Sequence, residues 1–171
     1  MKYLKWITIG TLLGGLLIYG YLKTKFPTIN DITTSPKAPL EFQALKSENP
    51  GRDMGYPPEF REIQWQSYPD VKPLDLSQPP EEVFQKVLAL VRRQERWQIF
   101  QESNDQRRVE LVASTQLMKF KDDVVIEVQP STDGGSRVEM RSKSRKGLSD
   151  LGANAKRIQS FLKELRQSMG G

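Results

Sequence analysis

The sequence predicts an α+β fold, with two helices covering an antiparallel four-stranded sheet and one N-terminal transmembrane helix in front of this two-layer domain. Three features support this prediction. Residues 6–22 carry no charge, apolar side chains alternate with polar ones over residues 97–144, and apolar side chains recur at helical spacing on both sides of that region. A chain of 171 residues has room for one domain of about 100 residues and an attached segment.

The first 25 residues have the features of a membrane anchor. Residues 6–22 would form a helix of about 25 Å, which approaches the thickness of the hydrocarbon core. Aromatic residues stand near both ends, and lysines flank the segment: Lys2, Lys5, Lys23 and Lys25. We therefore expect residues 1–25 to form an uncleaved anchor in a lipid bilayer, with the small lysine bias placing the domain outside the cytoplasm. The alternatives are a buried helix and a cleaved signal peptide, but Tyr19, Tyr21 and Leu22 stand where a signal peptide has small residues.

Residues 26–66 are predicted to be a linker. They contain six prolines, which exclude a long helix or a central strand: Pro27, Pro36, Pro39, Pro50, Pro57 and Pro58. Scattered apolar residues are expected to pack on the domain: Phe42, Leu45, Phe60, Ile63 and Trp65. The domain itself is predicted to occupy residues 67–171.

Within this domain, a helix is predicted to begin at Pro79 and Pro80, because proline fits the first turn and an apolar stripe follows over residues 83–91. Four strands are then expected, within residues 97–102, 107–120, 122–130 and 136–144, because the apolar period changes to two and turn residues separate the runs. A last helix is expected from about residue 150, with one apolar face: Leu151, Ala155, Ile158, Leu162 and Leu165.

Composition excludes several classes of function. The chain has no Cys and no His, which excludes Ser-His-Asp and Cys-His nucleophile systems and any thiolate or imidazole metal site. The net charge of +5 lies almost entirely in the predicted anchor, so the domain is nearly neutral and a nucleic-acid partner is not indicated. We expect no cofactor and no metal.

Two adjacent acids, Asp122 and Asp123, begin the third predicted strand. Because neighbouring strand residues point to opposite faces, Asp122 and Asp123 cannot serve one reacting centre, which argues against a paired-carboxylate hydrolase. Asp122 lies on the same face of the strand as Val124, Ile126 and Val128, so we expect it to be buried. Because a buried carboxylate needs a compensating cation, we expect an arginine beside it. Asp123 is expected to be exposed.

The stretch RSKSRKGLSDLGANAKRI, residues 141–158, together with FKDD and YPDVKPL, resembles the bacterial and plastid family DUF1499, a domain of unknown function. The resemblance covers roughly residues 68–165. It rests on matches to an FxDD stretch and an RSxSRxGxSDLGxNAxRI signature: Phe120, Asp122, Asp123, Arg141, Ser142, Ser144, Arg145, Gly147, Ser149, Asp150, Leu151, Gly152, Asn154, Ala155, Arg157 and Ile158. It implies a fold-level relationship and an envelope setting, and it implies no activity.

The polar residues of this stretch admit two main interpretations. In the first, they form a structural network that joins the last strand to the last helix: Asp122, Ser144, Arg145, Asp150 and Asn154. In the second, they bind an external anion, such as a phosphate, a carboxylate or a lipid headgroup: Arg141, Lys143, Arg145, Lys146, Asn154 and Arg157. Lys143 and Lys146 are expected to be solvated, and Arg145, Asn154 and Arg157 to lie inside.

The sequence therefore favours a membrane-tethered envelope or plastid-membrane protein that acts as a non-catalytic binding or structural module. Its expected partners are the bilayer and an anionic ligand or a membrane protein. The alternative is an enzyme that uses the cluster of Asp122, Arg145 and Asn154.

Overall fold

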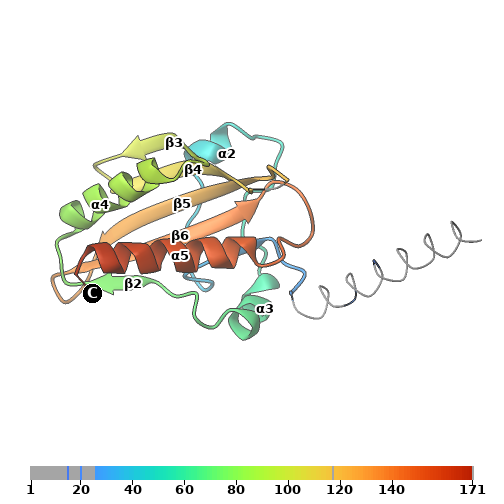
Figure 1. Cartoon of the computed structure of the whole chain (residues 1–171), viewed down its shortest axis with the longest axis horizontal. Helices are drawn as coiled ribbons and strands as arrows, with labels where there is room; N and C mark the ends of the chain where they lie inside the picture. The colour runs from blue at the N-terminus through green and yellow to red at the C-terminus, as the bar shows by residue number, and fades with distance from the viewer. Residues whose placement is uncertain (1–14, 16–19, 21–25, 117, 171) are drawn as a thin grey trace, which may run out of the picture.

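The computed structural model describes residues 15, 20, 26–116 and 118–170, and it shows one antiparallel sheet with helices packed on it (Figure 1). The elements follow in chain order: β1 (Asp31–Thr33), α2 (Ala44–Ser47), α3 (Phe60–Ser67), β2 (Leu74–Leu76), α4 (Pro80–Arg93), β3 (Trp97–Ser103), β4 (Arg108–Ser114), β5 (Lys121–Pro130), β6 (Ser136–Ser144) and α5 (Ala153–Ser168). The α+β class is confirmed.

The sheet of the described chain has six strands, in the order β1-β6-β5-β4-β3, with β2 also paired to β6. The prediction of four strands is therefore wrong. The four long strands lie where the period of two placed them, but β1 and β2 each contribute three more residues to the free edge of β6. Strands this short contain too few residues for an alternating pattern to be recognised.

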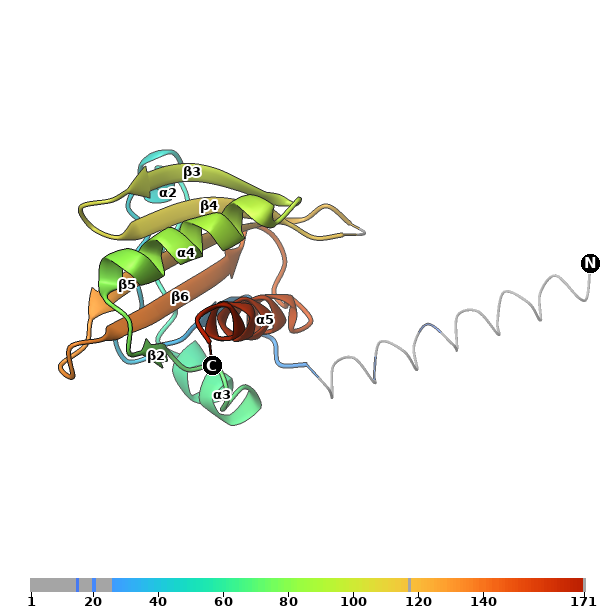
Figure 2. The ribbon, with the colours of Figure 1, turned by 60° about the vertical axis from the view of Figure 1, so that its left-hand side comes forward.

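One face of the sheet is covered by α4 and α5, which run across it side by side (Figures 1 and 2). Helix α4 begins at Pro80 as predicted, and its apolar stripe is buried. The stripe packs with α5 and with the apolar residues of β4, β5 and β6 into the main core. Leu151 departs from the prediction, because it precedes α5 and is 52% exposed.

The other face is covered by residues 34–56, which include α2. The prediction that residues 26–66 form a linker is therefore wrong. Their prolines do limit the regular elements to short pieces, but several of their apolar side chains are buried, and a second core forms against Val125: Leu40, Phe42, Leu45 and Met54. Of the apolar residues expected to pack, Phe42 and Leu45 are buried, whereas Ile63 and Trp65 are exposed.

The predicted anchor, residues 1–25, lies outside the described residues except for Gly15 and Gly20. Within the part of the chain that is described, no helix has the length and apolar character needed to cross a bilayer.

Candidate functional site

A buried polar cluster joins the sheet to the first turns of α5. Asp122 is buried on β5, and its Oδ2 accepts a hydrogen bond of 2.5 Å from Nη2 of Arg157 on α5. The same guanidinium donates through Nη1 to Asn154 Oδ1 and, at 2.7 Å, to Ser142 Oγ. Asn154 Nδ2 in turn donates to Ser144 Oγ at 3.0 Å. Every polar side chain of this cluster has a partner inside the protein.

Asp150 anchors the start of α5. Its carboxylate accepts hydrogen bonds of 2.9 Å from the backbone N–H groups of Gly152 and Asn154. These N–H groups have no carbonyl partner within the helix, because they lie at its first turn. Burial raises the pKa of Asp150, the two backbone hydrogen bonds oppose that rise, and the charge of Asp122 adds to it. Asp150 therefore acts as a structural cap at this end of the cluster.

Arg141 and Lys143 point to the opposite face of the sheet and share Asp31 on β1. Arg141 binds this carboxylate through Nε at 3.0 Å and Nη2 at 2.8 Å, and Lys143 binds it through Nζ at 2.9 Å. The prediction that Lys143 is solvated is wrong, because its side chain is 11% exposed and fully engaged by Asp31 and by the carbonyl of Gly55. Neither cation is free for an external anion.

The guanidinium of Arg141 also fastens residues 34–56 to the sheet. It donates to the carbonyl oxygens of Leu40 at 2.7 Å and Met54 at 2.9 Å, and it lies 4.8 Å from the ring centroid of Phe42. The ring centroid of Tyr56 lies 5.7 Å from the same guanidinium. Burial and the charge of Asp31 raise the pKa of the Tyr56 phenol, so this ring stays neutral beside the pair.

Asp123 is buried, contrary to the prediction that it is exposed. It lies on the face away from α4 and α5, as its parity requires, but residues 34–56 cover that face. Its carboxylate binds Arg52 at 2.5 Å and Arg145 at 2.7 Å. Arg145 directly follows β6 and, like Arg141 and Lys143, points away from α5. It is therefore separated from Asp122, Ser144, Asp150 and Asn154. The proposed grouping of Arg145 with Asp122 and Asn154 is wrong.

Several buried charges were missed by the sequence analysis. Glu110 on β4 accepts hydrogen bonds from the backbone N–H groups of Gln43 at 2.6 Å and Leu45 at 2.8 Å, and so holds α2 against the sheet. Arg108 bridges Glu110 and Glu127. The sequence does contain a pattern that includes Arg108 and Glu110, because charged residues occupy alternate positions of β4. The same pattern is typical of a solvent-exposed strand face, so it did not indicate burial. Asp31 and Arg52 gave no signal, because they lie in the segment interpreted as a linker.

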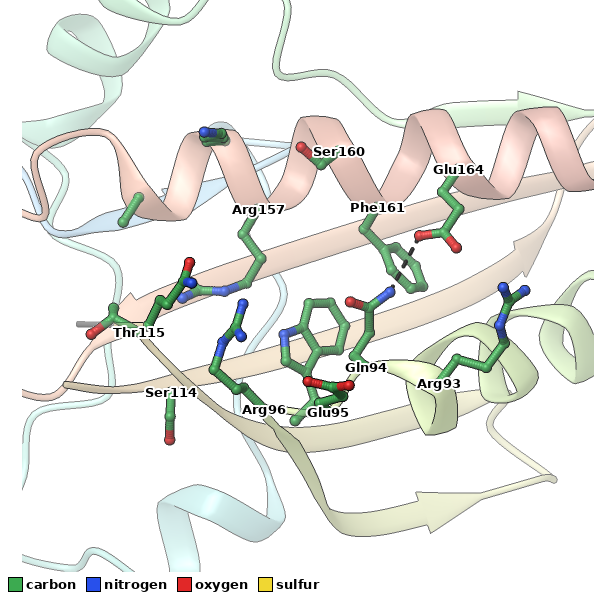
Figure 3. Close-up of a pocket in the computed structure, with 14 residues that line it drawn as sticks. Arg93, Gln94, Glu95, Arg96, Ser114, Thr115, Arg157, Ser160, Phe161 and Glu164 are labelled. Atoms are coloured by element: carbon green, nitrogen blue, oxygen red, sulfur yellow. Dashed lines mark hydrogen bonds between the residues drawn. The ribbon is translucent and has the colours of Figure 1, made fainter. Parts of the chain in front are cut away.

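A groove of about 570 Å³ lies where the end of α4, the start of β3 and α5 meet (Figure 3). Trp97 and Phe161 lie in it with stacked rings, 5.3 Å between centroids and 30° between planes. Four cationic side chains and two carboxylates line it: Arg93, Arg96, Lys156, Arg157, Glu95 and Glu164. We call this site the basic groove.

The cations of the basic groove differ in how they are compensated. Arg157 is paired with Asp122, and Glu164 accepts a hydrogen bond of 3.2 Å from Gln94. Arg93, Arg96 and Lys156 form no ion pair with any residue that the structure describes. Arg96 and Arg157 extend into the same end of the groove (Figure 3). This arrangement favours a ligand with a negative charge.

The sequence predicted a strand that begins at Trp97 and gave no sign of a groove beside it. The groove forms only when the turn after α4 meets α5, about 60 residues further along the chain. No group of three or more potential ligands among the described residues is arranged to hold a metal ion.

Comparison with protein families supports the resemblance seen in the sequence. The model of the family described as a protein of unknown function (DUF1499) matches residues 31–165. The chain belongs to this family. The match begins at β1, which agrees with the finding that residues 31–66 are part of the domain.

No curated protein gives a significant match. Among solved structures, the crystal structure of TTHA0849 from Thermus thermophilus is similar, with 12% sequence identity, coverage of 58% of this chain and 97% of that chain, and a TM-score of 0.32.

Most cations of residues 141–158 in this DUF1499 domain are occupied by partners within the fold. Arg141, Lys143, Arg145 and Arg157 bind buried carboxylates. Lys146 is exposed and pairs with no described carboxylate. The part of this stretch that remains open to an external anion is therefore small.

Proposed function

We propose that this protein is a membrane-tethered binding module that holds, in the basic groove, an anionic ligand with an apolar or aromatic part. The observation that carries this proposal is that three cations without an ion pair among the described residues, Arg93, Arg96 and Lys156, line the groove that holds the stacked rings of Trp97 and Phe161. The tether is residues 1–25, whose uncharged segment is flanked by lysines.

The chemistry of the groove matches such a ligand. A guanidinium binds a phosphate or carboxylate through two parallel hydrogen bonds, and an ammonium adds a point charge. The indole of Trp97 offers a flat apolar surface to the rest of the ligand. The volume of about 570 Å³ falls within the range of about 300–1,000 Å³ that is typical of small-molecule sites.

An enzyme remains the alternative hypothesis. Catalysis by a hydroxyl needs a base within hydrogen-bond reach of it. Ser114, Thr115 and Ser160 line the groove, but in the described chain none of them is hydrogen bonded to a carboxylate or an amine. This observation favours binding over turnover.

Calorimetry with phenyl phosphate tests the ligand class, because this probe has both the charge and the ring. The full chain would be held in discs of neutral phosphatidylcholine, so that the lipid itself does not compete for the cations. The variant Arg96→Gln with Lys156→Gln should bind about a hundredfold to ten-thousandfold more weakly, because two charge-assisted hydrogen bonds are lost, each contributes about 1.5–3 kcal/mol, and each 1.4 kcal/mol is a factor of ten.

The matched control is Arg92→Gln with Lys163→Gln, which removes the same charge from α4 and α5 outside the groove. It should bind as the unmodified chain does. Absence of binding by the unmodified chain, or equal weakening in both double variants, would exclude this function for the groove. The tether is tested separately by deleting residues 1–25, which should release the chain from membranes washed at high salt.

A further inference from the structure

Four exposed apolar side chains gather on two loops at one end of the domain. Among the described residues, the large apolar side chains exposed by more than half are Trp65 and these four: Met118, Phe120, Leu148 and Leu151. Met118 and Phe120 lie in the loop that joins β4 to β5, and Leu148 and Leu151 lie in the loop that joins β6 to α5. Leu148 is 81% exposed, the largest value of the set.

The two loops are neighbours in space. Phe120 and Leu151 line the same small pocket of about 160 Å³, together with Thr115 and Lys146. The backbone N–H of Arg145 also donates to the carbonyl of Lys121 at 3.0 Å. Figure 2 shows both loops at the end of the molecule where the first described residues of the domain lie. We call these two loops the loop end.

The loop end is positively charged. Lys119, Lys121 and Lys146 are exposed there. Asp150 is the acid of these loops, and its carboxylate is occupied by the backbone N–H groups at the start of α5. Apolar tips with lysines around them are suited to an interface between acyl chains and anionic headgroups, where the ammonium groups remain at headgroup level.

The chain enters the domain at this same surface. Phe26, the residue after the predicted anchor, packs against Gly152, where a Cβ atom would lie 3.0 Å from its ring. Pro27 accepts a hydrogen bond of 3.0 Å from Ser149 Oγ, and Asn30 donates to the carbonyl of Gly147 at 2.5 Å. An anchor that ends at residue 25 would therefore hold the loop end at the surface of the bilayer.

We infer that the loop end inserts Met118, Phe120, Leu148 and Leu151 into the interfacial region of an anionic phospholipid bilayer, with the three lysines contacting headgroups. This inference rests on the tether of the proposed function and is independent of the ligand in the basic groove. It fixes the orientation of the domain, because the loop end faces the bilayer and the opposite ends of the strands point away from it.

Fluorescence quenching tests this orientation, and the absence of cysteine in the chain makes single-site labelling simple. The variant Leu148→Cys carries an environment-sensitive dye, and the full chain is held in discs of phosphatidylcholine with phosphatidylglycerol. Quenchers attached to the lipid acyl chains should reduce the emission of this label and shift it to shorter wavelength. Phe100→Cys is the matched control, because Phe100 is an exposed apolar residue of β3 outside the loop end.

The charge contribution is tested by Lys119→Gln with Lys146→Gln in the Leu148→Cys chain. Quenching should fall in anionic discs, whereas Lys72→Gln with Lys163→Gln, at exposed sites elsewhere, should leave it unchanged. Failure of the chain to remain with the discs after a salt wash would overturn the tether. Retention on the discs with equal quenching at residues 148 and 100, or with no effect of lipid charge, would overturn the inference and leave the tether intact.

Discussion

Replacing Asp31 by alanine should destabilise the domain strongly. This carboxylate has no exposed surface and accepts three hydrogen bonds, two from Arg141 and one from Lys143. The alanine variant leaves a fully buried guanidinium and a nearly buried ammonium without a carboxylate. It also loosens the hold of Arg141 on Leu40 and Met54, and so of residues 34–56 on the sheet.

The expected magnitude follows from this burial. Breaking a buried ion pair by removing one partner costs about 3–5 kcal/mol, whereas an exposed pair contributes about 0–1 kcal/mol. In a domain of this size, each kcal/mol lowers the melting temperature by about 2–4 °C. We therefore expect Asp31→Ala to lower it by about 6–20 °C.

Thermal unfolding followed by circular dichroism measures this shift. Asp75→Ala is the matched control, because Asp75 also pairs with an arginine of β6, Arg137, at 3.2 Å, but its side chain is 60% exposed. Asp31→Asn should fall between the two, because it keeps one acceptor oxygen and loses the charge. A shift in Asp31→Ala no larger than that in Asp75→Ala would refute the reasoning that Asp31 holds these segments together.

Two further predictions concern the other buried acids. Asp122→Ala and Asp123→Ala should lower the melting temperature by similar amounts, because both carboxylates are buried and bound to arginine; a clearly smaller effect of Asp123→Ala would mean that residues 34–56 do not stay on the sheet. The second prediction concerns pH. Burial raises the pKa of Asp150 above 3.8, so the folded state binds this proton more tightly than the unfolded state does. The stability that Asp150 contributes is therefore greatest below pH 3.8 and is lost as pH rises through the pKa of the folded state. Denaturant titrations at several pH values should show the free energy of unfolding of the native chain falling over that range relative to Asp150→Asn; parallel profiles would contradict this.

The main layers of the fold could be predicted because their patterns are long. Helix α4 and the four long strands each extend over enough residues for an apolar period to be recognised. The predicted α5 differs from the observed helix only at its start, which is Ala153 and not about residue 150. Residues 26–66 could not be placed in this way, because β1 has three residues and α2 has four. Their position depends on contacts with charged residues of β4, β5 and β6, which no local pattern reveals.

Strand parity predicted the burial of Asp122 correctly and failed for Asp123, for an instructive reason. Parity gives the face of a residue, but exposure depends on what covers that face. Polar residues on the second face of the sheet were taken as a sign of solvent. They are buried because they bind one another and the backbone of residues 34–56.

The charged stretch 141–158 is explained by the same alternation. Ser142 and Ser144 point towards α5 and bind its polar residues. Arg141, Lys143 and Arg145 point towards residues 34–56 and bind acids of the neighbouring strands, Asp31 on β1 and Asp123 on β5. The stretch therefore links the helices on one face to the covering segment on the other. Substitutions of these paired residues should act through folding, whereas the exposed residues of the stretch, Lys146, Leu148, Leu151 and Lys156, belong to the two surfaces proposed for function.

The basic groove and the loop end are neighbouring surfaces, since Thr115 and Ala153 line both the groove and the small pocket between the loops. If the loop end faces the bilayer, the groove opens beside headgroups and acyl chains. An anion with an apolar part is the chemistry that such a position supplies, and it is the ligand class proposed for the groove from Arg96, Lys156 and the ring of Trp97. The two proposals were reached from different residues, yet they place the ligand and the membrane on the same side of the domain.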